Sequence, residues 1–122
     1  MTRYRRDLGR SGEQAAVGYL MEAGYTIVAT NYTTRFAEID IIAATSDCLV
    51  FVEVKARTSR SKGLPREAVH AAKQHKIIQA AQLFLKTQPP AACHHIRFDV
   101  MEIFFEPDQT RINHIPHAFQ IG

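Results

Sequence analysis

The stretch EIDIIAATSDCLVFVEVKAR, residues 38–57, has the pattern of a β-hairpin that carries charged side chains at one end. Isoleucine, valine and phenylalanine, which favour strands, dominate both halves. Ser46-Asp47 is the natural centre of the turn between them. A two-residue loop there and a four-residue loop from Thr45 to Cys48 give the same strand register, so the pairing does not depend on the loop type.

This register separates apolar from charged side chains. One face becomes apolar, with three pairs across the strands: Ile39 with Val54, Ile41 with Val52, and Ala43 with Val50. On the other face Asp40 lies opposite Glu53 and Glu38 lies opposite Lys55, and Ile42 and Phe51 continue that face toward the turn. A slip of one residue would turn charges onto the apolar face, so we expect this register.

The opposed carboxylates predict a metal site. Like charges directly across a ladder destabilise it, and a divalent cation between Asp40 and Glu53 would relieve the repulsion. Oxygen ligands suit Mg²⁺ or Mn²⁺. Lys55 shares the face of Glu53, where it could orient a water or stabilise charge that develops on phosphorus. We expect Glu13, which lies off the apolar stripe of its helix, to complete the site, and Glu38 either to reach the metal or to pair with Lys55.

The alternative is an ordinary hairpin with charged pairs on a solvated face. The strands are unusually rich in isoleucine, valine and phenylalanine for a hairpin with one wet face, and the charges gather at the end away from the turn. These two features favour the metal site.

The remaining pattern predicts a mixed α/β fold. A helix is expected at 11–23, with Ser11 as N-cap, Gln14 as its capping-box partner and Gly24 as the stop. We expect strands at 25–31, 36–44, 49–57 and 95–105, and a short edge strand before Pro116. The second helix should begin after Pro65 and end before Pro89. Short turns make consecutive strands antiparallel, and the second helix permits a parallel crossover, so we expect a mixed sheet flanked by helices.

Composition fits one domain with one core. The chain has 122 residues, of which 46% are apolar and 22% charged. It shows no apolar run long enough to span a membrane and no signal peptide, so no membrane partner is expected. Two cysteines, Cys48 and Cys93, fit a reduced cytoplasmic setting.

Basic residues gather in two clusters that suit a polyanion, although a solvated surface would look the same. Net charge is +3. Residues 1–10 are expected to form a flexible basic arm. The residues expected to contact nucleic acid are Arg10, Arg57, Arg60, Lys62, Lys73 and Lys76.

The hairpin residues resemble the PD-(D/E)xK nuclease signature, written here I-D…E-V-K. The element order matches a restriction-endonuclease-like core, α-β-β-β-α-β. The chain further resembles the bacterial YraN-like family of predicted endonucleases, which are similar to archaeal Holliday junction resolvases. The shared motifs are G-R-S-G-E at 9–13, N-Y at 31–32, E-I-D at 38–40, F-V-E-V-K-A-R at 51–57 and R-F-D-V at 97–100.

The resemblance implies a metal-dependent nucleic-acid hydrolase with Glu13, Asp40, Glu53 and Lys55 as its active-site set. Two positions depart from the pattern. Ala37 replaces the usual glycine of G-E-I-D, and Ile39 replaces the proline of the wider signature. Neither is a presumed ligand.

Histidines offer a second metal hypothesis, which the sequence disfavours. His94-His95 and the pair His114 and His117 lack matching cysteine spacing, and Pro116 breaks any helix that would align the second pair. Asp99 sits between aromatic and apolar residues and is expected to be structural or to bond a neighbouring loop.

The sequence therefore predicts a Mg²⁺- or Mn²⁺-dependent endonuclease that acts on DNA, including branched or structured DNA. The alternative is a nucleic-acid-binding module that keeps the fold without turnover, and a third reading is a protein-interaction domain with an incidental basic surface. A homodimer is expected by analogy with junction resolvases alone.

Overall fold

The computed structural model describes residues 3–58, 70–87 and 95–121, with side chains from residue 6 onward. Its elements follow the order α-β-β-β-α-β expected from the sequence, and the final edge strand that was also expected comes after them. The bounds are α1 Arg3–Glu22, β1 Thr26–Thr33, β2 Glu38–Ala44, β3 Cys48–Thr58, α2 Ala71–Thr87, β4 His95–Glu106 and β5 Gln109–Phe119. None of the described helices is long and apolar enough to cross a membrane.

The strands form a single mixed sheet in the order β1-β2-β3-β4-β5. Among the strands that the structure describes, β3 and β4 pair in parallel and the other three pairs are antiparallel. The reason is the connections, since β3 and β4 are joined through α2 whereas the other neighbours follow short turns. The expectation of a mixed sheet flanked by two helices is confirmed.

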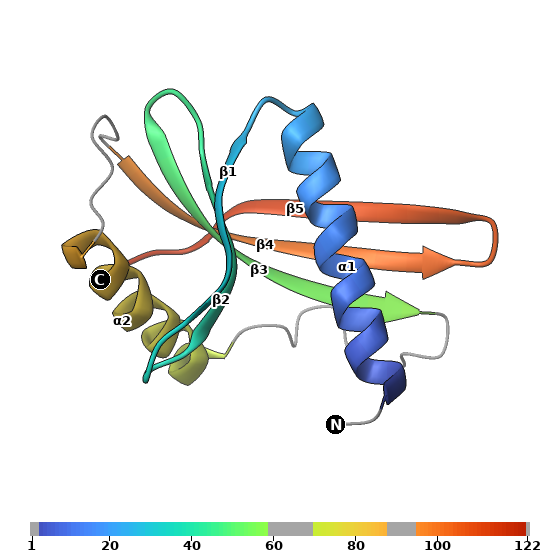
Figure 1. Cartoon of the computed structure of the whole chain (residues 1–122), viewed down its shortest axis with the longest axis horizontal. Helices are drawn as coiled ribbons and strands as arrows, with labels where there is room; N and C mark the ends of the chain where they lie inside the picture. The colour runs from blue at the N-terminus through green and yellow to red at the C-terminus, as the bar shows by residue number, and fades with distance from the viewer. Residues whose placement is uncertain (1–2, 59–69, 88–94, 122) are drawn as a thin grey trace.

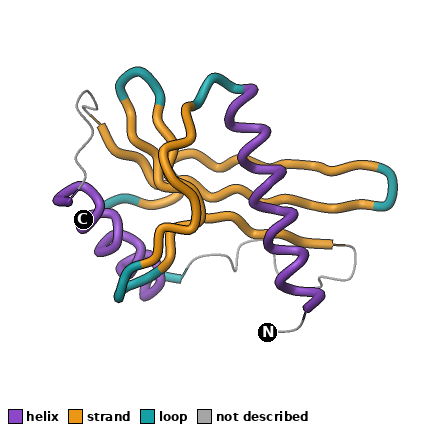
Figure 2. The backbone as a smooth tube through the Cα atoms, in the orientation of Figure 1, coloured by secondary structure: helices purple, strands orange, loops and turns teal. Residues whose placement is uncertain are grey.

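The two helices pack on opposite faces of the sheet and over different halves of it. Figures 1 and 2 show α1 crossing the half toward the β4–β5 turn, with α2 near the other end. Successive side chains of β3 point to opposite faces of the sheet, so they pack alternately into the core under α1 and the core under α2. Val50 and Val52 pack with Ala16 and Leu20 of α1, whereas Leu49 and Phe51 pack with α2. The buried residues of α2 are Ile77, Ala80, Ala81 and Phe84.

The β2–β3 register is confirmed near the turn. Ile41 pairs with Val52 and Ala43 with Val50, as the apolar pattern predicts. However, the ladder ends at Ile41–Val52, so Asp40 and Glu53 are not a ladder pair, and neither are Glu38 and Lys55.

Ile39 is also not on the predicted face. It belongs to the α2 cluster, whereas Ile41 belongs to the α1 cluster. A regular strand would put both on one face. Asn31, the β1 neighbour of this stretch, has a left-handed backbone (φ 51°), and β1–β2 pairing skips from Thr30–Ile41 to Tyr32–Ile39. The register is the same on both sides of this gap, so the change of face coincides with Asp40 itself, which is paired in neither ladder.

The predicted start of the first helix is wrong. The helix begins at Arg3, so Ser11 lies inside it rather than at its N-cap, and residues 3–10 are helical rather than a separate arm. Arginine and leucine in this segment are good helix formers, which outweighed the local capping signal.

Gly12 of α1 lies where the helix packs closely on β3. A Cβ there would lie 2.8 Å from the Cβ of Ala56 on β3, so its glycine allows close packing of α1 on the sheet.

The final strand is longer than predicted. β5 runs from Gln109 to Phe119 and passes through Pro116. Proline lacks a donor but is tolerated in an edge strand, and β5 is at the edge of the sheet. The α2 helix is described from Ala71 onward, so the predicted start after Pro65 lies outside the described residues.

Candidate functional site

The site begins where β2 and β3 part. Beyond the Ile41–Val52 pair, the backbone N–H of Val54 donates to Oδ2 of Asp40 at 2.8 Å. A side-chain oxygen thus takes the place of the carbonyl that a continued ladder would supply. Asp40 lies in the fork between the two strands, and this bond holds its carboxyl group there.

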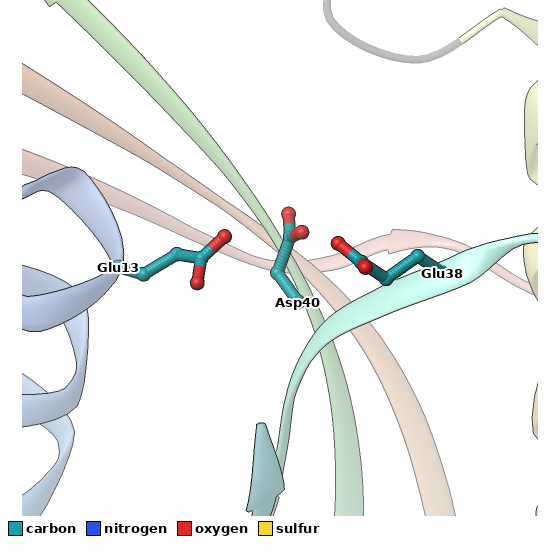
Figure 3. A group of neighbouring side chains, drawn as sticks. All are labelled: Glu13, Glu38 and Asp40. Carbon is teal, nitrogen blue, oxygen red and sulfur yellow. The ribbon is translucent and has the colours of Figure 1, made fainter. Parts of the chain in front are cut away.

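Three carboxyl groups meet at this fork. Glu13 of α1 and Glu38 and Asp40 of β2 each offer one oxygen, and these oxygens lie within 4.8 Å of one another. Figure 3 shows Glu13 and Glu38 reaching toward Asp40 from opposite sides. Glu53 of β3 adjoins the group, because its carboxyl shares a hydrogen bond with that of Asp40. The structure therefore brings together all four acidic residues predicted for the site.

The crowding of carboxyl groups at the fork changes the pKa of Asp40. Burial raises its pKa, the charges of Glu53 and Glu13 add to that effect, and the Val54 N–H bond opposes it, with the result that the pKa rises from 3.8 to about 8. Asp40 is therefore protonated at neutral pH in the metal-free protein, and can donate its hydrogen bond to Glu53.

The side chains of Lys55 and Lys73 both form ion pairs with Glu53, whose side chain is 7% exposed. The Nζ of Lys73 lies 2.5 Å from Oε2 of Glu53, and the Nζ of Lys55 lies 3.4 Å from the same oxygen. Burial lowers the pKa of Lys55, with a further contribution from Lys73, against the attraction of Glu53. For Lys73, burial also favours the neutral form, but the hydrogen bond and charge of Glu53 outweigh it, and the pKa is raised.

A pocket of about 550 Å³ opens onto these groups. It combines acidic side chains from the sheet with basic side chains from the N-terminal end of α2. Its lining residues are Ala37, Glu38, Asp40, Glu53, His70, Ala72, Lys73 and Lys76. A ligand in this pocket would meet carboxylates on one side and ammonium groups on the other.

Asn31 is a site residue whose role sequence reasoning missed. Its Nδ2 donates to Oε1 of Glu13 at 2.9 Å, and its left-handed backbone lies beside Asp40 across the β1–β2 ladder. A polar residue that tolerates positive φ, within a strand rich in β-branched residues, was the available signal. Together with the close packing at Gly12, this bond fixes where the Glu13 carboxyl lies.

The predicted nucleic-acid-binding residues are dispersed. Lys73 and Lys76 line the pocket, and Arg10 is exposed on α1 one turn before Glu13. Arg57 follows Lys55 on the same strand face, and its Nε lies 3.8 Å from Oε2 of Glu102. Arg60 and Lys62 lie outside the described residues.

The described histidines do not support the second metal hypothesis. His114 Nε2 lies 2.6 Å from Oδ2 of Asp99, and His117 contributes its backbone N–H to the same carboxyl group. Asp99 is fully buried and also accepts two hydrogen bonds from Arg97. Asp99 thus has a structural role within the sheet, which is the first of the two roles expected for it. His94 lies outside the described residues.

Comparison with known proteins assigns the family. The model of an uncharacterised protein family, UPF0102, matches residues 12–103. The chain belongs to UPF0102. This confirms the YraN-like family suggested by the sequence motifs, although the family description names no activity.

Members of UPF0102 from several bacteria match over nearly the whole chain. One from Desulforapulum autotrophicum is 48% identical over 120 residues, which is 98% of each chain. Another from Geobacter metallireducens is 43% identical over 123 residues, or 100% of this chain and 99% of the relative. The segment that matches the family model contains every acidic residue of the fork and both lysines at Glu53.

Proposed function

We propose that this UPF0102 protein is a metal-dependent endonuclease that hydrolyses phosphodiester bonds in DNA, including branched or structured DNA. The observation that carries the proposal is the fork between β2 and β3, where Glu13, Glu38 and Asp40 converge beside Glu53 and Lys55. Carboxylates crowded in this way and partly buried are costly unless a cation binds them.

The donor set fits a hard divalent cation. Every acidic ligand at the fork offers oxygen, which suits Mg²⁺ or Mn²⁺ rather than a metal that prefers sulfur or imidazole. Asp40, Glu53 and Glu13 would hold the ion, and Glu38 is placed to join them. When bound, such an ion polarises a phosphoryl oxygen and lowers the pKa of a coordinated water.

The chain's own residues supply the remaining requirements of hydrolysis. A water oxygen forms a bond to phosphorus, the bond from phosphorus to the leaving oxygen breaks, and that oxygen takes up a proton. The ammonium group of Lys55, which is held at the fork by Glu53, can stabilise the charge that develops on phosphorus or orient the water. Lys76, Arg10 and Arg57 would contribute phosphate contacts.

The sequence signature supports the same conclusion. Asp40, Glu53 and Lys55 fall at the positions of a PD-(D/E)xK nuclease motif, and the fold carries them on two adjacent strands as that motif requires. Membership of the nuclease superfamily is part of this proposal, since UPF0102 itself has no assigned chemistry.

Cleavage assays on several nucleic acids test the proposal. Branched, duplex and single-stranded DNA, with RNA for comparison, are incubated with Mg²⁺ or Mn²⁺ and with chelator. We expect cutting that requires the metal, and a loss of about 10²-fold or more in Asp40→Asn. Asp108→Asn, which changes an exposed carboxylate in the β4–β5 turn, should cut like wild type.

A non-catalytic nucleic-acid-binding module gives a different result. It would bind DNA in a salt-sensitive manner without metal-dependent cleavage. Glu53 is already paired with two ammonium groups, which is the feature that favours this second candidate. If no substrate is cut, or if Asp40→Asn cuts as well as wild type, the endonuclease proposal fails.

A further inference from the structure

Lys73 comes from α2, whereas Glu13 comes from α1 and the other charged groups of the fork come from the sheet. It lies four residues before Ile77 on α2, and therefore on the same helix stripe as Ile77, Ala81 and Phe84, which are buried against the sheet. Those three residues contact the apolar part of the sheet face. One turn earlier, the same stripe meets Glu53 instead. The packing of α2 thus holds Lys73 over the acidic fork.

The contact with Glu53 is closer for Lys73 than for Lys55. The two Nζ atoms approach the same oxygen, Oε2, at 2.5 Å and 3.4 Å respectively. Lys73 is also the more exposed of the two, at 40% against 28% for Lys55. The lysine with the closer contact is therefore also the one with more freedom to move away.

An ion held by Glu53 would need the oxygen that Lys73 now contacts. A carboxylate oxygen can serve more than one donor, but two cations at the same oxygen repel each other. The Lys73 side chain lines the pocket and has room there to move away from Glu53, whereas Lys55 is not among the described lining residues. Of the two lysines, Lys73 is the one that can leave.

From this geometry we propose that Lys73 is an internal counter-cation, which neutralises Glu53 in the metal-free protein and is displaced when a divalent cation binds. The inference rests on the proposed function, because it assumes that Glu53 is a metal ligand. Lys73 remains in the lining of the pocket after displacement, where its ammonium group becomes available to a phosphate oxygen of bound nucleic acid. The competition lowers metal affinity when no nucleic acid is present.

Calorimetric titration of Mn²⁺ into the full chain, without nucleic acid, tests the inference. Lys73→Met removes the charge and keeps a long apolar stem of good helix propensity. We expect Lys73→Met to bind Mn²⁺ about fivefold more tightly than wild type, which corresponds to loss of one partly exposed competing ion pair. Lys86→Met, at the opposite end of α2, makes the same charge change away from the fork and should bind like wild type.

Further variants distinguish the direct contact between Lys73 and Glu53 from the general electrostatic field of the basic residues in the pocket. Lys76→Met removes a pocket charge for which no contact with Glu53 is seen among the described residues, so its gain in Mn²⁺ affinity should be clearly smaller. In a Glu53→Gln background, where the shared carboxylate is gone, Lys73→Met should change Mn²⁺ affinity no more than Lys76→Met does. Thermal unfolding without metal should show a lower melting temperature for Lys73→Met, and added Mn²⁺ should reverse that loss.

The outcomes distinguish this inference from the proposed function. If wild type binds Mn²⁺ and Lys73→Met binds it equally or more weakly, Lys73 is only a structural partner of Glu53, and the metal-site proposal stands. If neither protein binds Mn²⁺, both are overturned. If Lys73→Met binds Mn²⁺ where wild type does not, the counter-cation role is supported directly.

Discussion

Asp99, which is fully buried, and Asp40, which is partly buried, lie in the same sheet with opposite surroundings. Asp99 is bonded by Arg97, by His114 and by the backbone N–H of His117. Among the described residues, Asp40 has one such donor, Val54, and its other neighbours are the carboxyl groups of Glu13, Glu38 and Glu53. One aspartate is therefore satisfied by the protein itself, and the other is not.

Their pKa values move in opposite directions for this reason. Burial favours the protonated form of both. For Asp99 the bonds donated by His114 and Arg97 outweigh burial and lower the pKa, while the bond that Arg97 donates to Asp99 raises the pKa of Arg97. For Asp40 the neighbouring carboxylates add to burial and raise the pKa to about 8. A complete set of donors indicates a structural role, whereas an excess of acceptors indicates a site for a cation.

The largest loss of stability should come from substitution of Asp99, whose carboxyl group is hydrogen-bonded by Arg97, His114 and His117. Asp99→Asn leaves the Arg97 guanidinium without its charged partner in the interior, and we expect the free energy of unfolding to fall by about 3–5 kcal/mol. Urea unfolding measures this loss. A change below about 1 kcal/mol would show that the Asp99 cluster is not structural, and would remove the contrast with Asp40.

Gly12→Ala should give the next largest effect, because α1 must move to accommodate the new Cβ against Ala56. We expect a loss of about 1–3 kcal/mol in unfolding free energy, with weaker Mn²⁺ binding since Glu13 moves with the helix. Gly9→Ala is the matched control, since its Cβ meets nothing within 4 Å. That variant should be stabilised by up to about 1 kcal/mol through helix propensity. Equal effects of the two substitutions would contradict the close-packing argument.

Substitution of a partly buried aspartate usually lowers the unfolding free energy, whereas Asp40→Asn should raise it. In the metal-free protein at pH 8–9, removal of the unfavourable charge should raise the unfolding free energy by about 1–2 kcal/mol. Asn keeps an acceptor for the Val54 N–H. The same variant should lose the stabilisation that Mn²⁺ gives to wild type, measured by thermal unfolding with and without the ion.

The pH dependence of stability follows from the same shift. Asp40 keeps its proton up to about pH 8 in the folded protein, whereas in the unfolded chain it loses the proton near pH 3.8. Its contribution is therefore complete below pH 3.8 and is lost as the pH rises toward 8. Asp99 acts in the opposite sense, because its contribution is present above pH 3.8 and is lost as the pH falls toward its lowered pKa. A metal-free stability profile that Asp40→Asn leaves unchanged between pH 4 and pH 8 would contradict the raised pKa.

The smallest effect on stability should come from Asn31→Gly. Glycine accepts the left-handed backbone, so the unfolding free energy should change by only about 0.5 kcal/mol. The loss of the amide that holds Glu13 should nevertheless weaken Mn²⁺ binding, by about threefold, measured by calorimetry. Asn31→Ala removes the same amide and adds backbone strain of about 1 kcal/mol. Unchanged Mn²⁺ affinity in Asn31→Gly would mean that Glu13 needs no support from Asn31.

Much of the fold followed from local pattern, and the failures have local causes. Apolar alternation placed four of the strands to within a few residues, and the turn at Ser46-Asp47 gave the correct register of the β2–β3 ladder. Ser11 misled the start of α1, because a capping residue inside a helix looks the same in sequence as one at its end. The predicted β5 stopped before Pro116, although an edge strand can continue through a proline, as β5 does.

For the candidate site, too, some features could be predicted from the local sequence and others depended on the tertiary structure. Residue type and spacing alone singled out Asp40, Glu53 and Lys55, since opposed charges in apolar strands are costly without a purpose. Only the tertiary structure separated β2 from β3 at Asp40, gave Val54 as its donor, and brought Asn31 to Glu13. It also placed Lys73 on Glu53, a contact between residues 20 positions apart. Alternation within a strand is a local property and can be read from sequence, whereas the gap between two strands and the approach of a helix depend on packing throughout the molecule.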